Sequence, residues 1–501
     1  MRSAGILLHI TSLPSDYPSG DLGPGAYAFA DFLAESYQEY WQVLPITPVT
    51  SANAYSPYSS DSGMAGNVLL ISPDGMSEMG LLDKSDLVSE PGSPEVSDLN
   101  ATEKIKNHLF DKAWKKYQAT KKFPWQEAFD DFIQKEDYWL GDYALYVALK
   151  KHHQELPWYS WPDEYKLRQK SALKEFTQAS AGMILREKLL QFVFHKQWMS
   201  LHEYCISRGV RIFGDLPFYL SYDSAEVWSS REMFNLHANG TMAGVAGVPP
   251  DYFSATGQLW GMPTYNWESL RLSGYRWWIR RIQHSMQLFD KIRIDHFRAF
   301  DQYWEVPPDS DTAEVGEWKD GPGENFFKSV QDVFGDLPIV AEDLGDKMER
   351  VHELCHRLRI PGMRVLLFAF GDHLATSIDI PHNYERNCVC YTGTHDNNTV
   401  RGWYVDDASD VEKQNVSRYL SRKVDERNVS HLLCMLAYAS VARLCILPMQ
   451  DVLNLDGRAR MNKPGMTSDN WKWRMAPGHL NEGVKELLRE WTNTYHRGSR
   501  T

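Results

Sequence analysis

The sequence has few cysteines, no long apolar run and no excess of positive charge. Its 501 residues include six cysteines, none at the paired spacing of a metal site, so we expect buried, reduced thiols. No stretch approaches the ~20 apolar residues that span a bilayer, and the N-terminus lacks the apolar core and cleavage site of a signal peptide. These absences predict a cytoplasmic protein that contacts no membrane and uses no metal or cofactor.

Acidic residues outnumber basic ones by 66 to 53, which gives a formal net charge of -13 at pH 7. Such a balance repels the phosphate backbone of nucleic acids and the surface of anionic membranes. We therefore expect a neutral partner and no binding of nucleic acid.

Eight short apolar runs, each flanked by turn-forming or polar residues, predict eight β-strands. Eight is the number of parallel strands in a (β/α)8 TIM barrel, which has a helix after each strand. We predict an α/β protein in which residues 1–501 form one such catalytic barrel, without a separate C-terminal β-sandwich. The predicted strands are residues 5–9, 41–45, 210–216, 291–295, 338–341, 363–368, 389–391 and 445–448.

The spacing of these runs predicts insertions on the C-terminal face of the barrel. One strand and its helix need on the order of 30 residues, but roughly 165 residues separate the second and third runs and roughly 75 the third and fourth. We expect a mainly helical insertion over residues 70–205 and an insertion with a lid loop over residues 220–285. In the first, apolar spacing predicts one helix capped by Asn100 with Glu103, and another from about Met183 to Ser207.

Three acidic residues follow predicted strands. Asp295 ends the run KIRID, Glu342 follows PIVA, and Asp396 lies in YTGTHDN after CVCY. The C-terminal ends of the strands of a parallel barrel converge on one face, where the active sites of such barrels lie. We therefore expect these carboxylates to surround one cavity.

Paired carboxylates of this kind are typical of glycoside chemistry. Cleavage of a glycosidic bond with retention uses one carboxylate as nucleophile and a second carboxylic acid as proton donor, about 5 to 5.5 Å apart. Asp295 and Glu342 follow adjacent predicted strands and could reach this separation. Arg293 lies two residues before Asp295 on the same strand face, where its positive charge would keep the nucleophile ionised.

Other interpretations of these residues exist. A single acid after a strand is commonly a loop cap or a solvated charge, and an arginine such as Arg293 can form a purely structural ion pair. A metal-dependent barrel hydrolase could be built from His9, His296, His395 and Asp396, although strand one lacks a His-x-His pair. A glucan-binding protein without catalysis would need no trio of carboxylates.

Residues 244–261 (GVAGVPPDYFSATGQLWG) are rich in Gly and Pro and yet carry Tyr252, Phe253 and Trp260. Aromatic rings offer flat apolar faces to sugar rings. We interpret the segment as an aromatic lid over the cleft; the alternative is that these rings anchor the loop to the core.

Motifs along the whole chain carry a resemblance to a known family. They are HITSLPS, SPYSSDSGMAGN, FGDLPFYLSYDSAEVW, GVPPDYFSATGQLWG, KIRIDHFRAF, VAEDLG, YTGTHDNNT, RMNKPG and NWKWR. In these motifs the chain resembles the 4-α-glucanotransferases, also called amylomaltases or disproportionating enzymes, of the α-amylase superfamily.

The resemblance implies a role for each matching residue. It makes Asp295 the nucleophile, Glu342 the general acid/base and Asp396 the residue that stabilises the transition state. It also implies that three basic residues border the subsite of cleavage, and that the following substrate contacts surround them. The basic residues are Arg293, His296 and His395, and the further contacts are Ser56, Tyr58, Asp215, Tyr252, Phe253, Trp260 and Asn462.

The chain departs from the family pattern at a few positions. Where the family often has Phe-Asp-Gly, this chain has Phe370, Gly371 and Asp372, which would displace an acidic contact to the donor sugar. GNPLY is replaced by GMPTY beside the predicted lid, and AGNPLL by AGNVLL at Val68. None of these changes touches the acid/base pair.

The reaction implied by the resemblance is a retaining transfer. An α-1,4-linked glucan segment would move from a maltooligosaccharide donor to the 4-hydroxyl of an acceptor glucan or of glucose, through a covalent glycosyl-enzyme. The alternative is an α-amylase-type retaining hydrolase that uses the same three carboxylates, with water as the acceptor.

Overall fold

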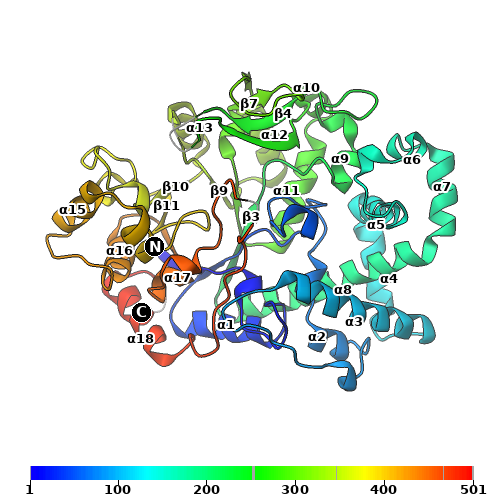
Figure 1. Ribbon diagram of the computed structural model, residues 1–501, viewed down its shortest axis with the longest axis horizontal. Coiled ribbons are helices and arrows are strands. Elements are labelled where there is room, and N and C mark those ends of the chain that lie inside the picture. The colour runs from blue at the N-terminus through cyan, green and yellow to red at the C-terminus, as the bar shows by residue number, and fades with distance from the viewer. Residues whose placement is uncertain (1, 251–253, 346, 467, 499–501) are drawn as a thin grey trace.

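An eight-stranded parallel sheet forms the centre of the molecule (Figure 1). The computed structural model describes residues 2–250, 254–345, 347–466 and 468–498. All eight strands predicted from the sequence are present, and their order in the sheet is β10-β11-β12-β1-β2-β3-β6-β9. Their bounds are β1 Ser3–Leu7, β2 Tyr40–Gln42, β3 Arg211–Leu216, β6 Lys291–Ile294, β9 Ile339–Ala341, β10 Gly362–Val365, β11 Cys388–Tyr391 and β12 Leu444–Pro448.

The sheet curls into a nearly closed barrel. Neighbouring strands pair in parallel register from β10 through to β9, for example Gly5 with Tyr40 and Ile294 with Ala341. The two ends of this series meet where the amide of Ala341 donates a hydrogen bond to the carbonyl of Pro361, at 2.9 Å, directly before β10. The predicted (β/α)8 fold is therefore confirmed.

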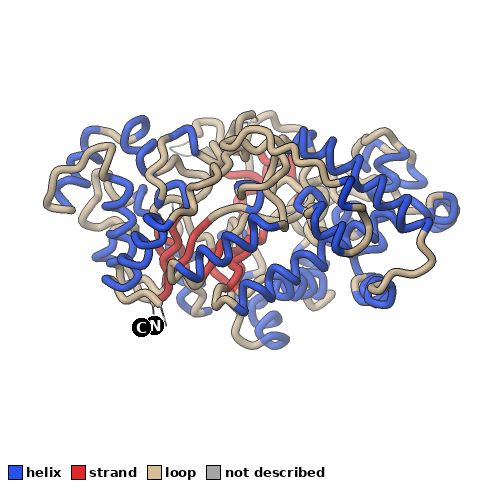
Figure 2. Tube along the Cα trace, turned by 90° about the horizontal axis from the view of Figure 1, so that it is seen from below, coloured by secondary structure: helices blue, strands red, loops and turns tan. Residues whose placement is uncertain are grey.

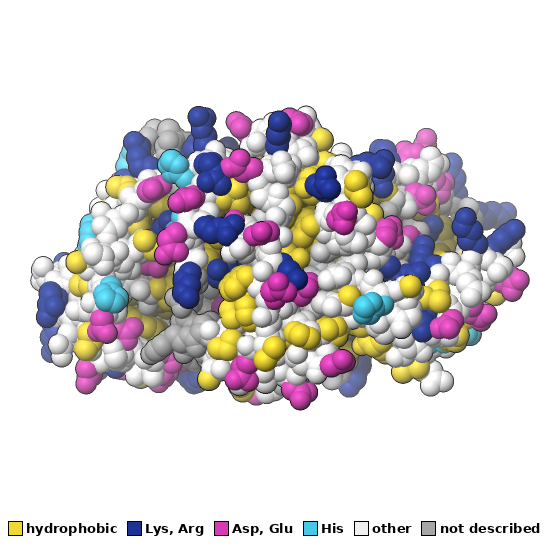
Figure 3. Space-filling model, turned by 90° about the horizontal axis from the view of Figure 1, so that it is seen from above, with side chains coloured by type: hydrophobic (Ala, Val, Ile, Leu, Met, Phe, Trp, Pro, Cys, Tyr) yellow, Lys and Arg dark blue, Asp and Glu magenta, His cyan; other side chains and the backbone are white. Residues whose placement is uncertain are grey.

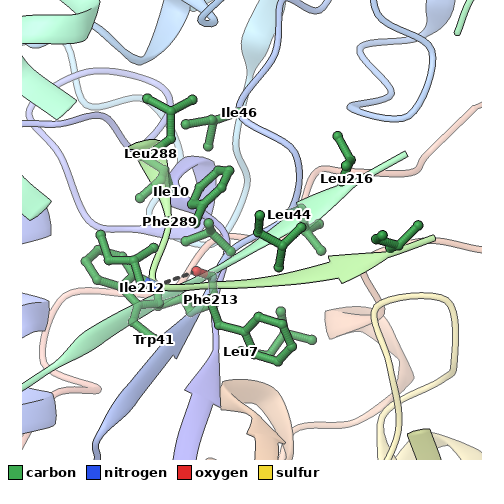
Figure 4. Packing of buried hydrophobic residues seen from close by; sticks show 14 of the residues in the cluster. Leu7, Ile10, Trp41, Leu44, Ile46, Ile212, Phe213, Leu216, Leu288 and Phe289 are labelled. Carbon is green, nitrogen blue, oxygen red and sulfur yellow. Dashed lines mark hydrogen bonds between the residues drawn. The ribbon is translucent and has the colours of Figure 1, made fainter. Parts of the chain in front are cut away.

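Large apolar side chains fill the space inside and around the strands. Figure 4 shows part of this core, in which Trp41, Ile212 and Phe213 are fully buried. Each such side chain contributes about 1.5 to 3 kcal/mol when it leaves water. Gly214 of β3 lies directly under the ring of Phe289, and a Cβ added there would meet the ring at 2.3 Å, so only glycine permits this packing.

Helices connect the strands and cover the outside of the barrel. One or more of them lie in almost every connection, and their apolar faces contribute buried residues to the core, such as Phe29 and Trp278. They are α1 Pro24–Glu35, α9 Ala225–Ser229, α10 Trp267–Leu272, α11 Arg276–Leu288, α12 Gly323–Phe334, α13 Glu349–Leu358, α14 Val400–Gly402, α15 Asp410–Tyr419, α16 Val429–Ala439, α17 Met449–Val452 and α18 Glu482–Thr494.

A group of helices between β2 and β3 extends to one side of the barrel, on the right in Figure 1. Its longest member begins at Ala181 and ends at Ser207, which confirms the helix predicted from about Met183. The group comprises α2 Pro73–Glu78, α3 Leu99–Ala119, α4 Gln126–Lys135, α5 Asp137–His152, α6 Asp163–Lys166, α7 Lys170–Ala179 and α8 Ala181–Ser207.

The predicted cap of α3 is wrong. Asp98, not Asn100, is the N-cap, and its carboxylate accepts a hydrogen bond from the amide of Ala101 at 2.9 Å. Glu103 accepts instead from the hydroxyl of Tyr55, at 2.9 Å. Asp and Asn have similar preferences for the N-cap, so composition alone did not separate the two positions.

A small antiparallel sheet lies above the barrel in Figure 1 and was not predicted. Its strands are β4 Val245–Val248, β5 Gln258–Pro263, β7 Gln302–Val306 and β8 Glu317–Asp320, in the order β5-β4-β7-β8. Two of them, β4 and β5, pair as the arms of the segment that we interpreted as a lid loop. The sheet is thus assembled from segments on both sides of β6.

The two ends of the described chain lie side by side, where Arg2 and Arg497 form a β-bridge (Figure 2). All six cysteines are buried and unpaired, as predicted. On the face seen in Figure 3, acidic and basic side chains are interspersed. Within the described residues, every helix is too short or too polar to cross a bilayer.

Candidate active site

Two of the predicted acids lie next to each other at the C-terminal end of the barrel. Ile294 of β6 pairs with Ala341 of β9, and Asp295 and Glu342 are the residues that follow each of them. Neighbouring strands lie about 4.8 Å apart, so these two carboxylates leave the sheet side by side. The amide of Glu342 donates to the carbonyl of Ile294 at 3.0 Å, which fixes this arrangement.

Arg293 joins two carboxylates through its guanidinium group. Nη1 donates to both carboxylate oxygens of Asp215, at 2.9 and 2.7 Å, and Nη2 donates to Oδ1 of Asp295 at 2.8 Å. Burial opposes the charge of Arg293, but Asp215 and Asp295 outweigh it and raise its pKa well above the ordinary value. Arg293 is therefore a permanent cation that holds Asp295 in one orientation.

Asp215 lies near the end of β3 and is almost fully buried. Its pKa is raised by burial, against the opposing charge of Arg293. The hydroxyl of Tyr58 donates to Asp215 Oδ2 at 2.8 Å, and burial together with the Asp215 charge raises the pKa of Tyr58 well above its ordinary value. Tyr58 therefore remains a neutral hydrogen-bond donor.

Two backbone amides hold the carboxylate of Glu342. The amide of His296 donates to Oε2 at 2.9 Å, and that of Leu344 donates to Oε1 at 3.0 Å. Burial, reinforced by the negative charge of Asp295 and opposed by Arg293, raises the pKa of Glu342 to about 7. A carboxyl with this pKa can both donate and accept a proton at neutral pH.

His296 has an unusual backbone conformation. Its φ of 49° and ψ of 46° lie in the left-handed region, which directs its amide toward Glu342. Its ring meets the ring of Trp260 edge to face, with centroids 4.7 Å apart. Burial, with a further contribution from Arg298, lowers the pKa of His296 to about 3, so the ring is neutral. Strained residues of this kind concentrate at functional sites.

Asp396 lies in the loop after β11, with its side chain partly exposed. Its Oδ1 accepts a hydrogen bond from Asn462 Nδ2 at 2.5 Å and lies 3.3 Å from His395 Nε2. Arg460 Nη2 donates to the Asp396 carbonyl at 2.6 Å. The segment that follows α17 thus orients the acid that follows β11.

Aromatic rings connect Asp396 to the other carboxylates. Tyr58 stacks on His395 with centroids 5.0 Å apart and planes 9° from parallel. Trp471 packs against both rings, at 5.9 and 6.1 Å. Because Tyr58 also binds Asp215, all four acids belong to one connected cluster.

The remaining predicted substrate contacts lie around this cluster, with exceptions. The hydroxyl of Ser56 accepts a hydrogen bond from the amide of Tyr58 at 3.3 Å. Tyr252 and Phe253 lie outside the described residues. Asp372 is exposed in the loop that follows β10. The residue roles themselves are not tested by this geometry and stay predictions.

Three residues of the cluster were not singled out from the sequence. Trp471 and Arg460 stand in the motifs NWKWR and RMNKPG, which carried the resemblance, so a signal was present. Tyr219, whose ring lies 5.9 Å from Trp260 and 6.0 Å from His296, stands in FGDLPFYLSYDSAEVW. Their contacts depend on loops that meet only in the folded chain.

Two hollows flank the cluster. One, of about 30 Å³, is bordered by Tyr58, Asp215 and Tyr219, and the other, of about 20 Å³, by His9 and His395. Within the ranges that the structure describes, no group of three or more His, Cys, Asp or Glu side chains is arranged to hold a metal ion.

Comparison with known proteins gives consistent matches. A family model described as 4-alpha-glucanotransferase matches residues 8–481. A 4-alpha-glucanotransferase of Aquifex aeolicus is 44% identical over 490 residues, covering 97% of this chain and 99% of the relative. One from Thermus thermophilus is 43% identical over 486 residues, covering 96% of each.

Solved structures agree with these matches. An amylomaltase from Streptococcus agalactiae, in complex with acarbose, is 39% identical and superimposes with a TM-score of 0.95 over 100% of both chains. An amylomaltase from Corynebacterium glutamicum is 17% identical and has a TM-score of 0.74, covering 99% of this chain and 74% of that one. The second likeness concerns the fold alone.

Proposed function

The chain belongs to the 4-alpha-glucanotransferase family, enzymes that act on α-glucans, and we propose that it works by double displacement with the three carboxylates described above. An α-1,4-linked segment moves from a maltooligosaccharide donor to the 4-hydroxyl of an acceptor glucan or glucose. A cytoplasmic location stays a prediction. The barrel with its insertions at residues 70–205 and 220–285 acts as one catalytic unit in this proposal.

In the first step, Asp295 attacks the anomeric carbon while Glu342 protonates the departing glycosidic oxygen. The observation that carries this assignment is the placement of the two carboxyls directly after the paired residues Ile294 and Ala341. A pKa of about 7 leaves Glu342 protonated in a large fraction of molecules at neutral pH. The bond to the leaving chain breaks and a glycosyl ester with Asp295 forms.

In the second step, Glu342 works in the opposite direction. Its carboxylate takes the proton from the 4-hydroxyl of the acceptor, whose oxygen attacks the anomeric carbon and displaces Asp295. Glu342 returns to the acid form and Asp295 to the carboxylate. Two inversions at one carbon give net retention.

The other residues of the cluster position the sugar and stabilise its charge. Asp396 stabilises the positive charge that develops at the anomeric centre, and Asn462 holds its carboxylate. The stacked pair of Tyr58 and His395 offers a flat surface to the sugar ring at the site of cleavage. Arg293 binds Asp295 and Asp215 and holds both carboxylates in position.

Transfer exceeds hydrolysis only when the acceptor sugar is bound and water is kept from the glycosyl-enzyme. Each tenfold preference corresponds to about 1.4 kcal/mol between the two barriers. The ring of Trp260 on β5 lies against His296, and this contact supports a role for Trp260 in covering the glycosyl-enzyme. We assign this protection to the small sheet above the barrel.

Incubation with maltotriose distinguishes transfer from hydrolysis by the same carboxylates. We expect glucose together with oligosaccharides longer than maltotriose, analysed by chromatography over time. Glucose and maltose as the only products would favour the α-amylase-type hydrolase.

A further inference from the structure

A wide hollow lies at the N-terminal end of the barrel, opposite the carboxylate cluster. It encloses about 2600 Å³, its open mouth included. Residues at or beside the start of all eight barrel strands border it. They include Ser3, Tyr40, Arg211, Lys291, Ile339, Pro361, Cys388 and Leu444.

Five cationic residues border this hollow: Arg357, which pairs with Glu324, and Arg359 lie at the end of α13, and three more lie at the starts of barrel strands. Arg211 and Lys291 are the first residues of β3 and β6, and Arg443 directly precedes β12. Arg211 Nη1 donates to the hydroxyl of Tyr40 at 3.1 Å. The side chains of Lys291 and Arg443 have no hydrogen bond or ion pair with any residue that the structure describes.

Three carboxylates also border the hollow, and the hydrogen bond with Tyr40 together with the charges of Glu39 and Asp290 raises the pKa of Arg211. Asp290 accepts hydrogen bonds from His202 Nε2 at 2.9 Å and from the amide of Ile212 at 2.8 Å. Glu39 accepts from the hydroxyl of Ser3 at 2.7 Å. Asp336 is exposed to solvent at the rim.

The cations also disfavour one another. Burial lowers the pKa of Lys291, and the neighbouring charges of Arg443 and Arg211 lower it further. Five cations face three carboxylates in this lining, and Lys291 and Arg443 have no partner among the described residues, so an anion that binds between them would relieve their repulsion.

We propose that this hollow binds a phosphate group, either as free phosphate or as part of a phosphorylated sugar. Guanidinium and ammonium groups are the side chains that most often bind phosphate oxygens. The hollow is far larger than a phosphate ion, which leaves room for an attached sugar. Lys291 precedes Asp295 by four residues on one strand, about 13 Å, so this ligand and the glucan bind at opposite ends of the barrel.

Calorimetric titration of the full-length protein with sodium phosphate and with glucose 1-phosphate, at constant ionic strength, tests the proposal. We expect binding that is at least tenfold weaker in Lys291→Met and in Arg443→Met, while Lys174→Met, which removes an exposed lysine of α7, leaves it unchanged. Equal affinity for the two ligands identifies a site for the phosphate group alone, and tighter binding of the sugar phosphate a site for both parts.

Thermal unfolding gives a second measurement. Without phosphate, Lys291→Met should unfold at a Tm no lower than the wild type, because a like charge is removed; added phosphate should raise the wild-type Tm and not that of the variant. Arg443 is exposed, so Arg443→Met keeps the test valid if Lys291→Met folds poorly. The proposal is overturned if neither ligand binds more than chloride does, or if both variants bind like Lys174→Met.

Discussion

The protonation state of Glu342 determines which step of the proposed reaction it can catalyse. The acid form serves the first step and the carboxylate the second. The pKa of about 7 for Glu342 means that the acid form is lost as the pH rises through 7. We expect kcat/KM for maltotriose to fall above about pH 7. In Glu342→Gln, with maltotriosyl fluoride as a donor that needs no proton, this fall should disappear, whereas Glu486→Gln, an exposed site on α18, should keep the fall when it is assayed with maltotriose.

The same group affects stability with a definite sign. The pKa of Glu342 is higher in the folded protein, about 7, than its ordinary value of 4.5, so the folded state binds more protons between these values. This contribution to the free energy of unfolding is fully present below about pH 4.5 and is lost as the pH rises to about 7. Urea unfolding should show Glu342→Gln gaining stability relative to the wild type across this window. A constant difference would contradict the raised pKa.

His296 tests whether backbone conformation orients the acid. A β-branched residue strongly disfavours the left-handed region, whereas glycine adopts it freely. We expect His296→Val to lose about 1 to 2 kcal/mol of stability and to shift the pH profile of kcat, because the amide no longer points at Glu342. His296→Gly keeps the amide in place and should retain the wild-type profile with a higher KM. If both variants had the same profile, the amide would have no orienting role.

The sequence predicted which acids gather at the rim and that Arg293 holds Asp295, but not what holds Glu342 and Asp396. Asp295 and Glu342 could be placed because they follow apolar strands, and strand order determines their proximity. The amide of His296 could not be foreseen, because its contact depends on a positive φ at a residue that is not glycine. The hydrogen bond from Asn462 to Asp396 likewise joins two loops that are distant in sequence.

Among secondary-structure elements, the strands of the barrel were predictable because each is a short apolar run between polar turns. The small sheet was not, since β4 pairs with β7 from beyond β6 and its Gly- and Pro-rich sequence is typical of a loop. The cap of α3 was placed two residues late, because Asp98 and Asn100 are both good N-caps. Long-range pairing and the choice between equivalent caps are both decided by tertiary contacts.

Trp260 on β5 tests the role of the small sheet. Removing its ring from the contact with His296 opens the cluster to water and removes an apolar face for the sugar. We expect Trp260→Ala to raise the KM for maltotriose and to increase glucose release by hydrolysis relative to transfer by about tenfold, or about 1.4 kcal/mol. Chromatography of the products measures this ratio.

Trp318→Ala is the matched control for this prediction. Trp318 lies on β8, at the opposite edge of the same sheet, and is 38% exposed. Its substitution should leave the ratio of hydrolysis to transfer unchanged. The same change of ratio in both variants would mean that the sheet acts through its stability and not through Trp260.

At the scale of the whole molecule, a buried ion pair joins the helices between β2 and β3 to the barrel. Lys106 of α3 is fully buried, and its Nζ donates to Asp21 at 3.2 Å and to the carbonyls of Leu69 and Ile71 at 2.7 and 2.8 Å. Burial raises the pKa of Asp21 while Lys106 opposes the rise. Lys106 of α3 thus binds both the loop after β1, through Asp21, and the segment before α2.

Removing this cation should be strongly destabilising. Lys106→Met leaves a buried carboxylate without its partner, and we expect a loss of about 3 to 5 kcal/mol in the free energy of unfolding at pH 7. Lys115→Met, on the exposed side of the same helix, should change it by less than about 0.5 kcal/mol. The double variant Asp21→Asn, Lys106→Met should recover most of the loss. Urea unfolding of the three variants decides this; equal effects of Lys106→Met and Lys115→Met would contradict it.

The covalent glycosyl-enzyme on Asp295 is the intermediate on which the proposed mechanism depends, and mass spectrometry can detect it directly. Glu342→Gln incubated with maltotriosyl fluoride should form the ester rapidly and release it slowly, because no base activates the acceptor. The account predicts a mass increase of one maltotriosyl group, located on the peptide that contains Asp295. Consumption of the donor without an adduct, or an adduct on Asp396, would contradict it.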